Sequence, residues 1–218
     1  MNTTTTTSIH SFPPEQHPEK HKTRTTTLDL LRDPECPTNL FYDRHLTRDW
    51  MELCGEAPDA TCGLLLDEGV LAPDHGRYIG VNTNQGIIDR NATLYNDNRT
   101  EWRCGDMSRL LLDLDDPTLR NIGVLVFDGF RSPSNHHLES ILLPMFAFAQ
   151  SQQQRFGQFL LVINLALRGN ASAPLEKAKR QFEAIVHKHC GVRVPLSAFT
   201  TYRSRVVPMQ LLRLSYGW

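Results

Sequence analysis

Three polar residues, each placed directly after a short apolar run, are the side chains in this sequence best suited to chemistry. They are Asn82 after Tyr78–Val81, Asp106 after Trp102–Cys104, and Asp128 after Ile122–Phe127. A carboxylate accepts hydrogen bonds and takes up protons, while an amide both donates and accepts. In parallel sheets, ligands sit outside the carboxyl ends of the strands. If the apolar runs are such strands, these polar residues are placed to meet a ligand.

Asp128 is the strongest single candidate for a reactive or binding residue, because it ends the most apolar of the three runs. An aspartate there is also typical of a loop cap. His136 and His137 offer an alternative base, although histidines at a helix start usually face solvent. Asn164 lies within an apolar run and is expected to be a hydrogen-bonded core amide. Cys104 has no base near it in sequence, which argues against a nucleophilic thiol.

The elements that must position these residues alternate between strand and helix. Between Arg77 and Met107, a strand, a helical stretch and a second strand make one βαβ unit, the building block of parallel sheets. The downstream pattern predicts helices at Ser108–Leu114, Leu138–Gln154 and Leu175–His189, and strands at Ile122–Phe127, Gln158–Leu167, Val192–Tyr202 and Pro208–Tyr216. The last two strands indicate an antiparallel hairpin. Right-handed crossovers then predict an α/β fold, a three-layer Rossmann-like sandwich with a mostly parallel sheet and a C-terminal antiparallel hairpin.

Before Tyr78 the pattern is more irregular. Asn39–Tyr42 indicates a short strand or a buried turn. Thr47 follows as a plausible N-cap for a helix that carries Trp50, Met51 and Leu53. A further helical turn or two is expected around Cys62–Leu66, ending near Gly69. This segment is therefore expected to bring a short strand and two helical pieces to the fold.

The chain is expected to hold one domain, residues 28–218, behind a disordered tail over residues 1–27. That tail is rich in Thr, Pro and His, and has too little apolar surface to offset its ordering entropy. Its histidines lack metal-ligand spacing and other ligands near them, so no metal site is expected.

The composition is that of an ordinary soluble globule, with 40% apolar and 22% charged residues and a net charge of −1. No global field therefore draws the chain to nucleic acid or to an anionic membrane. No apolar run reaches the ~20 residues needed to cross a bilayer, and no signal peptide is evident. Five cysteines without a CxxC spacing favour reduced thiols and a cytoplasmic protein.

From Tyr78 to Trp218 the chain resembles class I S-adenosylmethionine-dependent methyltransferases. The resemblance is carried by GVN ending at Asn82, WRCGDM at Trp102–Met107, VLVFDGF at Val124–Phe130 and the closing hairpin. No GxGxG occurs, although the family's first strand normally ends in an acid followed by a glycine-rich loop. Leu66–Gly69 lies too close to Asn82 to be that strand end. Asn39–Tyr42 is therefore favoured as strand one.

The resemblance implies S-adenosylmethionine as the cofactor and a set of residues that hold it. Tyr42 and Asp43 would take the place of the glycine loop. Asn82 would meet the ribose, more weakly than the usual acid because an amide carries no charge. Asp106 and Met107 would bracket the adenine, with the alternative that Asp106 only caps the following helix. Asp128 would take up a proton of the acceptor.

Two functions follow from these observations. The first is a divergent methyltransferase whose acceptor, like the oligomeric state, is not indicated by the sequence. The second is a methyltransferase-like protein that has lost catalysis and binds a partner. Arg203, Arg205 and Arg213 on the hairpin, among tyrosines, could stack on and neutralise single-stranded nucleic acid. Charges at a solvated sheet edge explain them equally well.

Overall fold

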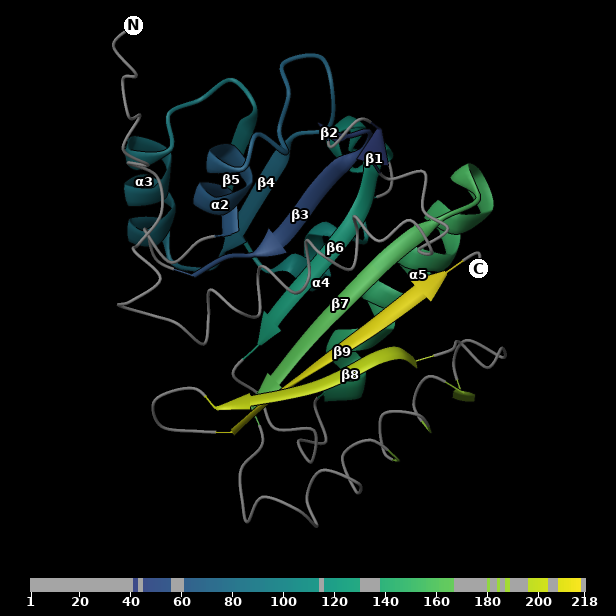
Figure 1. Cartoon of the computed structure of the whole chain (residues 1–218). Coiled ribbons are helices and arrows are strands. Elements are labelled where there is room, and N and C mark those ends of the chain that lie inside the picture. The colour runs from purple at the N-terminus through teal and green to yellow at the C-terminus, as the bar shows by residue number, and fades with distance from the viewer. Residues whose placement is uncertain are drawn as a thin grey trace, which may run out of the picture.

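A computed structural model describes residues 41–42, 45–55, 61–113, 116–129, 138–166, 196–203 and 208–216, and a few positions between 180 and 188 (Figure 1). In 41–42, 128–129, 138–139, 164–166 and the last two strands, the description covers the backbone alone. The predicted tail and most of the helix predicted at Leu175–His189 lie outside these residues.

The centre of the fold is a seven-stranded sheet of order β5-β4-β3-β6-β7-β9-β8. Its strands are β3 (Asp49–Leu53), β4 (Tyr78–Asn82), β5 (Thr100–Cys104), β6 (Ile122–Gly129), β7 (Phe159–Ala166), β8 (Leu196–Arg203) and β9 (Pro208–Tyr216). Neighbouring strands from β5 to β7 pair in parallel. β9 runs antiparallel to both β7 and β8. The α/β class, the mostly parallel sheet and the closing antiparallel pair are as predicted.

Helices cover both faces of this sheet. They are α2 (Thr61–Asp67), α3 (Gln85–Leu94), α4 (Met107–Leu110), the 3-10 helix η1 (Pro117–Asn121) and α5 (Leu138–Phe156). One buried cluster joins α4 and α5 to side chains such as Met51, Ile79 and Leu125. The other joins α2 to Trp50 and Tyr78 on the opposite face. The three layers follow from strands that are buried on both sides.

The first strand of the parallel sheet corrects the sequence analysis. β3 lies where a helix after Thr47 was predicted, so the helix prediction is wrong. Phe41–Tyr42 (β1) pairs antiparallel with His45–Leu46 (β2) in a separate two-stranded sheet, so Asn39–Tyr42 is not strand one. The reason lies in burial: four consecutive residues from Asp49 are buried, as in a central strand, whereas a surface helix buries one stripe.

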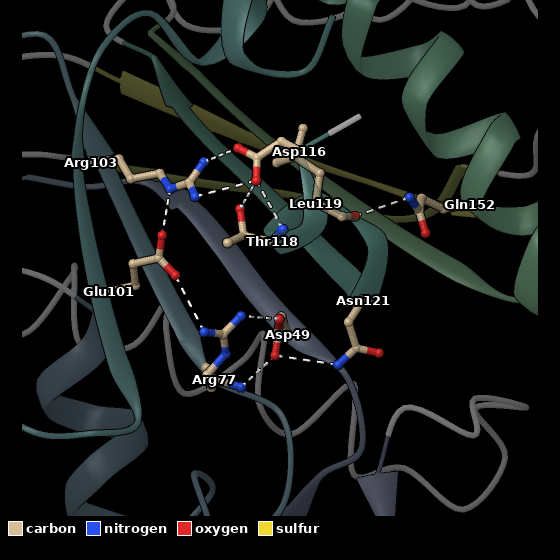
Figure 2. A network of polar contacts seen from close by, with 9 residues as sticks. All are labelled: Asp49, Arg77, Glu101, Arg103, Asp116, Thr118, Leu119, Asn121 and Gln152. Atoms are coloured by element: carbon tan, nitrogen blue, oxygen red, sulfur yellow. Dashed lines mark hydrogen bonds and ion pairs between the residues drawn. The ribbon is translucent and has the colours of Figure 1, made fainter. Parts of the chain in front are cut away.

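A chain of side chains with alternating charge links β5, β4 and β3 to one another (Figure 2). Asp49, 2% exposed, accepts hydrogen bonds from the backbone N–H of Arg77 at 2.8 Å and from its guanidinium at 3.1 Å. Arg77 pairs with Glu101 at 3.4 Å, Glu101 with Arg103 at 2.6 Å, and Arg103 with Asp116. A buried carboxylate is costly unless it is paired. The chain of charges therefore holds β5, the edge strand, to β4, β3 and the turn before β6.

Candidate functional site

The carboxyl ends of β3, β4 and β5 lie side by side at one edge of the sheet. Leu53 is in register with Val81, and Asn82 with Cys104. Just beyond, the N–H of Gly105 donates to the carbonyl of Asn82 at 2.9 Å. The structure thus brings together Asn82 and the Gly105–Asp106 turn, which sequence analysis had placed at one ligand site.

β3 contributes a turn at Cys54–Gly55 to this edge. The Cys54 N–H donates to the carbonyl of Val81 at 3.0 Å. After Gly55, residues 56–60 lie outside the described part of the chain, and α2 begins at Thr61. This strand, turn and helix take the place that sequence analysis gave to Tyr42 and Asp43. Tyr42 and Asp43 precede β3 and do not follow the first strand of the parallel sheet, so their role at the cofactor stays a prediction without support from the strand order.

Glu52 is the acidic residue near the end of β3, and sequence analysis missed it. It is 4% exposed. Its carboxylate accepts from the hydroxyl of Thr61 at 2.8 Å, from the indole N–H of Trp50 at 3.3 Å and from the hydroxyl of Tyr78 at 3.3 Å. The contact with Thr61 joins the end of β3 to the first residue of α2. The sequence does contain an acidic residue shortly before Cys54–Gly55, as expected for the end of strand one. It was not recognised because a helix had been predicted there.

Asn82 uses both ends of its amide within the protein. Its Nδ2 donates to the carbonyl of Cys54 at 2.7 Å, and its Oδ1 accepts from the N–H of Asn84 at 2.8 Å. Since one partner is a carbonyl and the other an N–H, the amide orientation is fixed. A carboxylate could not donate to Cys54. The amide is therefore matched to this strand end in a way that the family's usual acid is not.

Asp106 is exposed and caps α4, as the cap interpretation predicted. Its Oδ1 accepts from the N–H of Ser108 at 2.9 Å and from the Ser108 hydroxyl at 2.5 Å. These hydrogen bonds lower the pKa of Asp106, so the carboxylate is charged near neutral pH. Met107 is 2% exposed and packs in the cluster with α5. The edge therefore carries one fixed negative charge at the end of β5.

The other candidates lie partly outside the described residues. Asp128 is in β6, in register with Asn164 of β7, and its side chain is not covered, so its role stays a prediction. Asp43, His136 and His137 lie outside the described part. The same holds for the side chains of Arg203 and Arg213 and for all of Arg205, so nucleic-acid contact also stays a prediction.

The described residues lack two further features. They hold no group of three or more His, Cys, Asp or Glu that could bind a metal. Within the same residues, none of the helices has the length and apolar character needed to cross a membrane.

The fold matches solved structures, whereas no protein-family model and no curated protein matches the chain. The O-methyltransferase of Bacillus cereus, in complex with S-adenosylhomocysteine (SAH), has a TM-score of 0.55 at 12% identity, with 94% of this chain and 82% of that one covered. Human methyltransferase-like protein 13, also with SAH, has a TM-score of 0.54 at 14% identity, with 90% and 81% covered. A human methyltransferase 10 domain containing protein has 0.53 at 12%, with 95% and 89% covered. The chain therefore has, in divergent form, the Rossmann-like fold of class I S-adenosylmethionine-dependent methyltransferases.

Proposed function

We propose that the chain binds S-adenosylmethionine across the carboxyl ends of β3, β4 and β5 and transfers its methyl group to an acceptor. The observation that carries this proposal is the meeting of three consecutive strand ends at one edge. There the Cys54–Gly55 turn, Asn82 and Asp106 are held by hydrogen bonds between their own segments. Ligands of open parallel sheets bind at such an edge. Two of the similar folds were solved with SAH.

The residues at the edge fit the parts of this cofactor. The charged carboxylate of Asp106 is exposed and suits the amino group of adenine. The half-buried Asn82 keeps one lone pair on Oδ1 for a ribose hydroxyl, since the N–H of Asn84 uses the other. When bound, the cofactor supplies a methyl group on a sulfonium, which is ready for displacement. The protein's task is then alignment and exclusion of water, with Asp128 as the proposed group that takes up the acceptor's proton.

A second function, binding without catalysis, has its own support. Glu56, Ala57 and Pro58 follow Gly55 where the family has further glycines. Glycine lets a backbone approach a ligand closely, and these residues do not. A chain that holds the nucleoside loosely and has no working acceptor site would act as a binding module.

Calorimetric titration with SAH tests the proposed cofactor site. The wild type should bind with modest affinity. Asp106→Asn should weaken binding about tenfold, because a hydrogen bond to a charged group is worth about 1.5–3 kcal/mol. The matched control is Asp113→Asn, which removes an exposed carboxylate beyond α4 and should leave affinity unchanged. Absence of heat and of a thermal shift at millimolar SAH would contradict the proposal.

Transfer of a labelled methyl group to protein, RNA or small-molecule fractions separates the two functions. Label transferred in one fraction supports the enzyme and identifies the acceptor class. Tight SAH binding with no transfer to any fraction supports the binding module.

A further inference from the structure

Two asparagine side-chain amides donate hydrogen bonds to the turn that follows β3. The amide of Asn82, at the end of β4, donates to the carbonyl of Cys54 at 2.7 Å. The amide of Asn91, in α3, donates to the carbonyl of Gly55 at 3.0 Å and lies 3.6 Å from the sulfur of Cys54. Two successive carbonyls of one turn are thus bound by side chains from two other elements. The backbone N–H of Cys54 adds a third link, to Val81.

Asn91 is an unusual choice for its position. It is 0% exposed and lies within a helix whose other buried side chain is Ile88. A buried amide destabilises a protein unless its donors and acceptors are satisfied, so an apolar residue would be the simpler way to fill this space. The contacts with Gly55 and Cys54 satisfy the amide and explain why an asparagine is buried at this position.

We propose that Asn82 and Asn91 are positioning residues that fix the Cys54–Gly55 turn for the cofactor, in place of a glycine-rich loop. This inference rests on the proposed function. A glycine-rich loop lets the backbone come close to the methionine half of the ligand because it lacks side chains. Here the two amides hold the turn against β4 and α3, which presets its backbone before a ligand arrives. Ordering that is already present in the free protein does not have to be supplied by binding.

The proposal sets the direction of one substitution. Asn82→Asp introduces the acid that the family carries at this strand end. Here the ionised carboxylate would lose the donor to Cys54 and face its carbonyl. We therefore expect Asn82→Asp to loosen the turn and weaken SAH binding, where a ribose-binding role alone would predict tighter binding.

Cys54 provides a reporter within the turn itself. Its thiol is 2% exposed, and burial raises its pKa to about 12, so it should react with iodoacetamide only when the turn opens. Cys62 in α2 is 0% exposed and reacts only on wider unfolding. Mass spectrometry of the alkylated chain gives both rates in one sample, and their ratio separates local opening from global loss of stability.

The experiment compares Asn82→Ala, Asn91→Ala and Asn82→Asp with the wild type. The matched control is Gln152→Ala, because Gln152 is also a buried amide but donates to the carbonyl of Leu119 in η1, which precedes β6. The three test variants should raise the Cys54 rate about tenfold over that of Cys62 and weaken SAH binding about as much. A tenfold change corresponds to about 1.4 kcal/mol, which is within the range for the loss of one hydrogen bond. Gln152→Ala should change neither the ratio nor the affinity. If the alanine variants do not fold, the isosteric Asn82→Asp carries the test.

Two results overturn the inference: a Cys54 rate that rises only in step with Cys62, or an opened turn with unchanged SAH affinity. If the wild type binds no SAH, the proposed function fails, and the positioning role fails with it. The thiol ratio still shows in that case whether the two amides hold the turn. Failure of the positioning role of Asn82 and Asn91 and failure of the proposed function are thus distinguishable.

Discussion

At the scale of single residues, hydrogen bonds within the protein hold the side chains of the candidate site. Asn82 bridges two strand ends, Asp106 caps a helix, and Glu52 joins the end of β3 to the start of α2. A group fixed by its neighbours keeps its geometry when a ligand binds, which lowers the entropic cost of binding. The same contacts make each residue both structural and functional, so substitutions must separate the two roles.

Asp106 allows such a separation. Asp106→Ala removes the cap of α4 and should lower the free energy of unfolding by about 1 kcal/mol. Asp106→Asn keeps a good cap and should leave the stability within a few tenths of a kcal/mol of the wild type. The two unfolding free energies, measured in urea, check this. A loss of stability in Asp106→Asn as large as in Asp106→Ala would contradict the capping account.

The lowered pKa of Asp116 predicts that the free energy of unfolding depends on pH. The hydrogen bond from Arg103 lowers the pKa of Asp116 to about 2, from an ordinary value of 3.8. A depressed carboxyl pKa stabilises the fold at pH values above the unfolded pKa. This contribution is lost as the pH falls through the folded pKa, here between about pH 4 and pH 2. The stability difference between wild type and Asp116→Asn should therefore shrink as the pH falls from 5 toward 3, as urea titrations would measure.

Arg103→Met removes the main cause of that shift and gives a matched comparison. Its stability difference from the wild type should shrink over the same pH range. A difference that stays constant with pH for both variants would show that the pair between Arg103 and Asp116 does not stabilise the fold.

At the scale of elements, some strands could be predicted from the sequence more easily than others. β6 and β7 are long apolar runs, and β4 is a short one bounded by polar residues, so all three were predicted within a few residues of their observed ends. β3 was not. Asp49 and Glu52 interrupt it with charges whose partners, Arg77 and Thr61, lie outside the strand, 28 and 9 residues further along the chain. Burial of a charge by distant partners leaves no local pattern.

Gly80 in β4 determines how closely β5 packs on the strand beside it. A Cβ at this position would come within 2.4 Å of the Trp102 ring, which also stacks on Tyr95. Gly80→Ala should therefore destabilise the protein by about 1–3 kcal/mol through overpacking. Gly55→Ala is the control, because, apart from its chain neighbours, no atom of the described residues lies within 4 Å of its Cβ position. Thermal unfolding of both variants tests this, and equal melting temperatures would contradict the packing.

At the scale of the whole molecule, the predictable part of the site is the part that follows from topology. Asn82 and Asp106 were identified as polar residues after apolar runs, and parallel strands place such residues at one edge. The contact of Asn91 with Gly55 joins residues 36 positions apart in the sequence, on different elements. No spacing rule predicts it. Tyr42 and Asp43 were assigned to the cofactor through a misplaced first strand, so one error in an element removed the support for two site residues.

The most direct test of the account is hydrogen–deuterium exchange of the full chain with and without millimolar SAH. The central claim is that a nucleoside cofactor lies across the ends of β3, β4 and β5. It predicts slower exchange in peptides that span residues 52–61, 82–86 and 104–108, with little change around η1 and the amino ends of the strands. Protection confined to other regions, or none at saturating ligand, would contradict the claim.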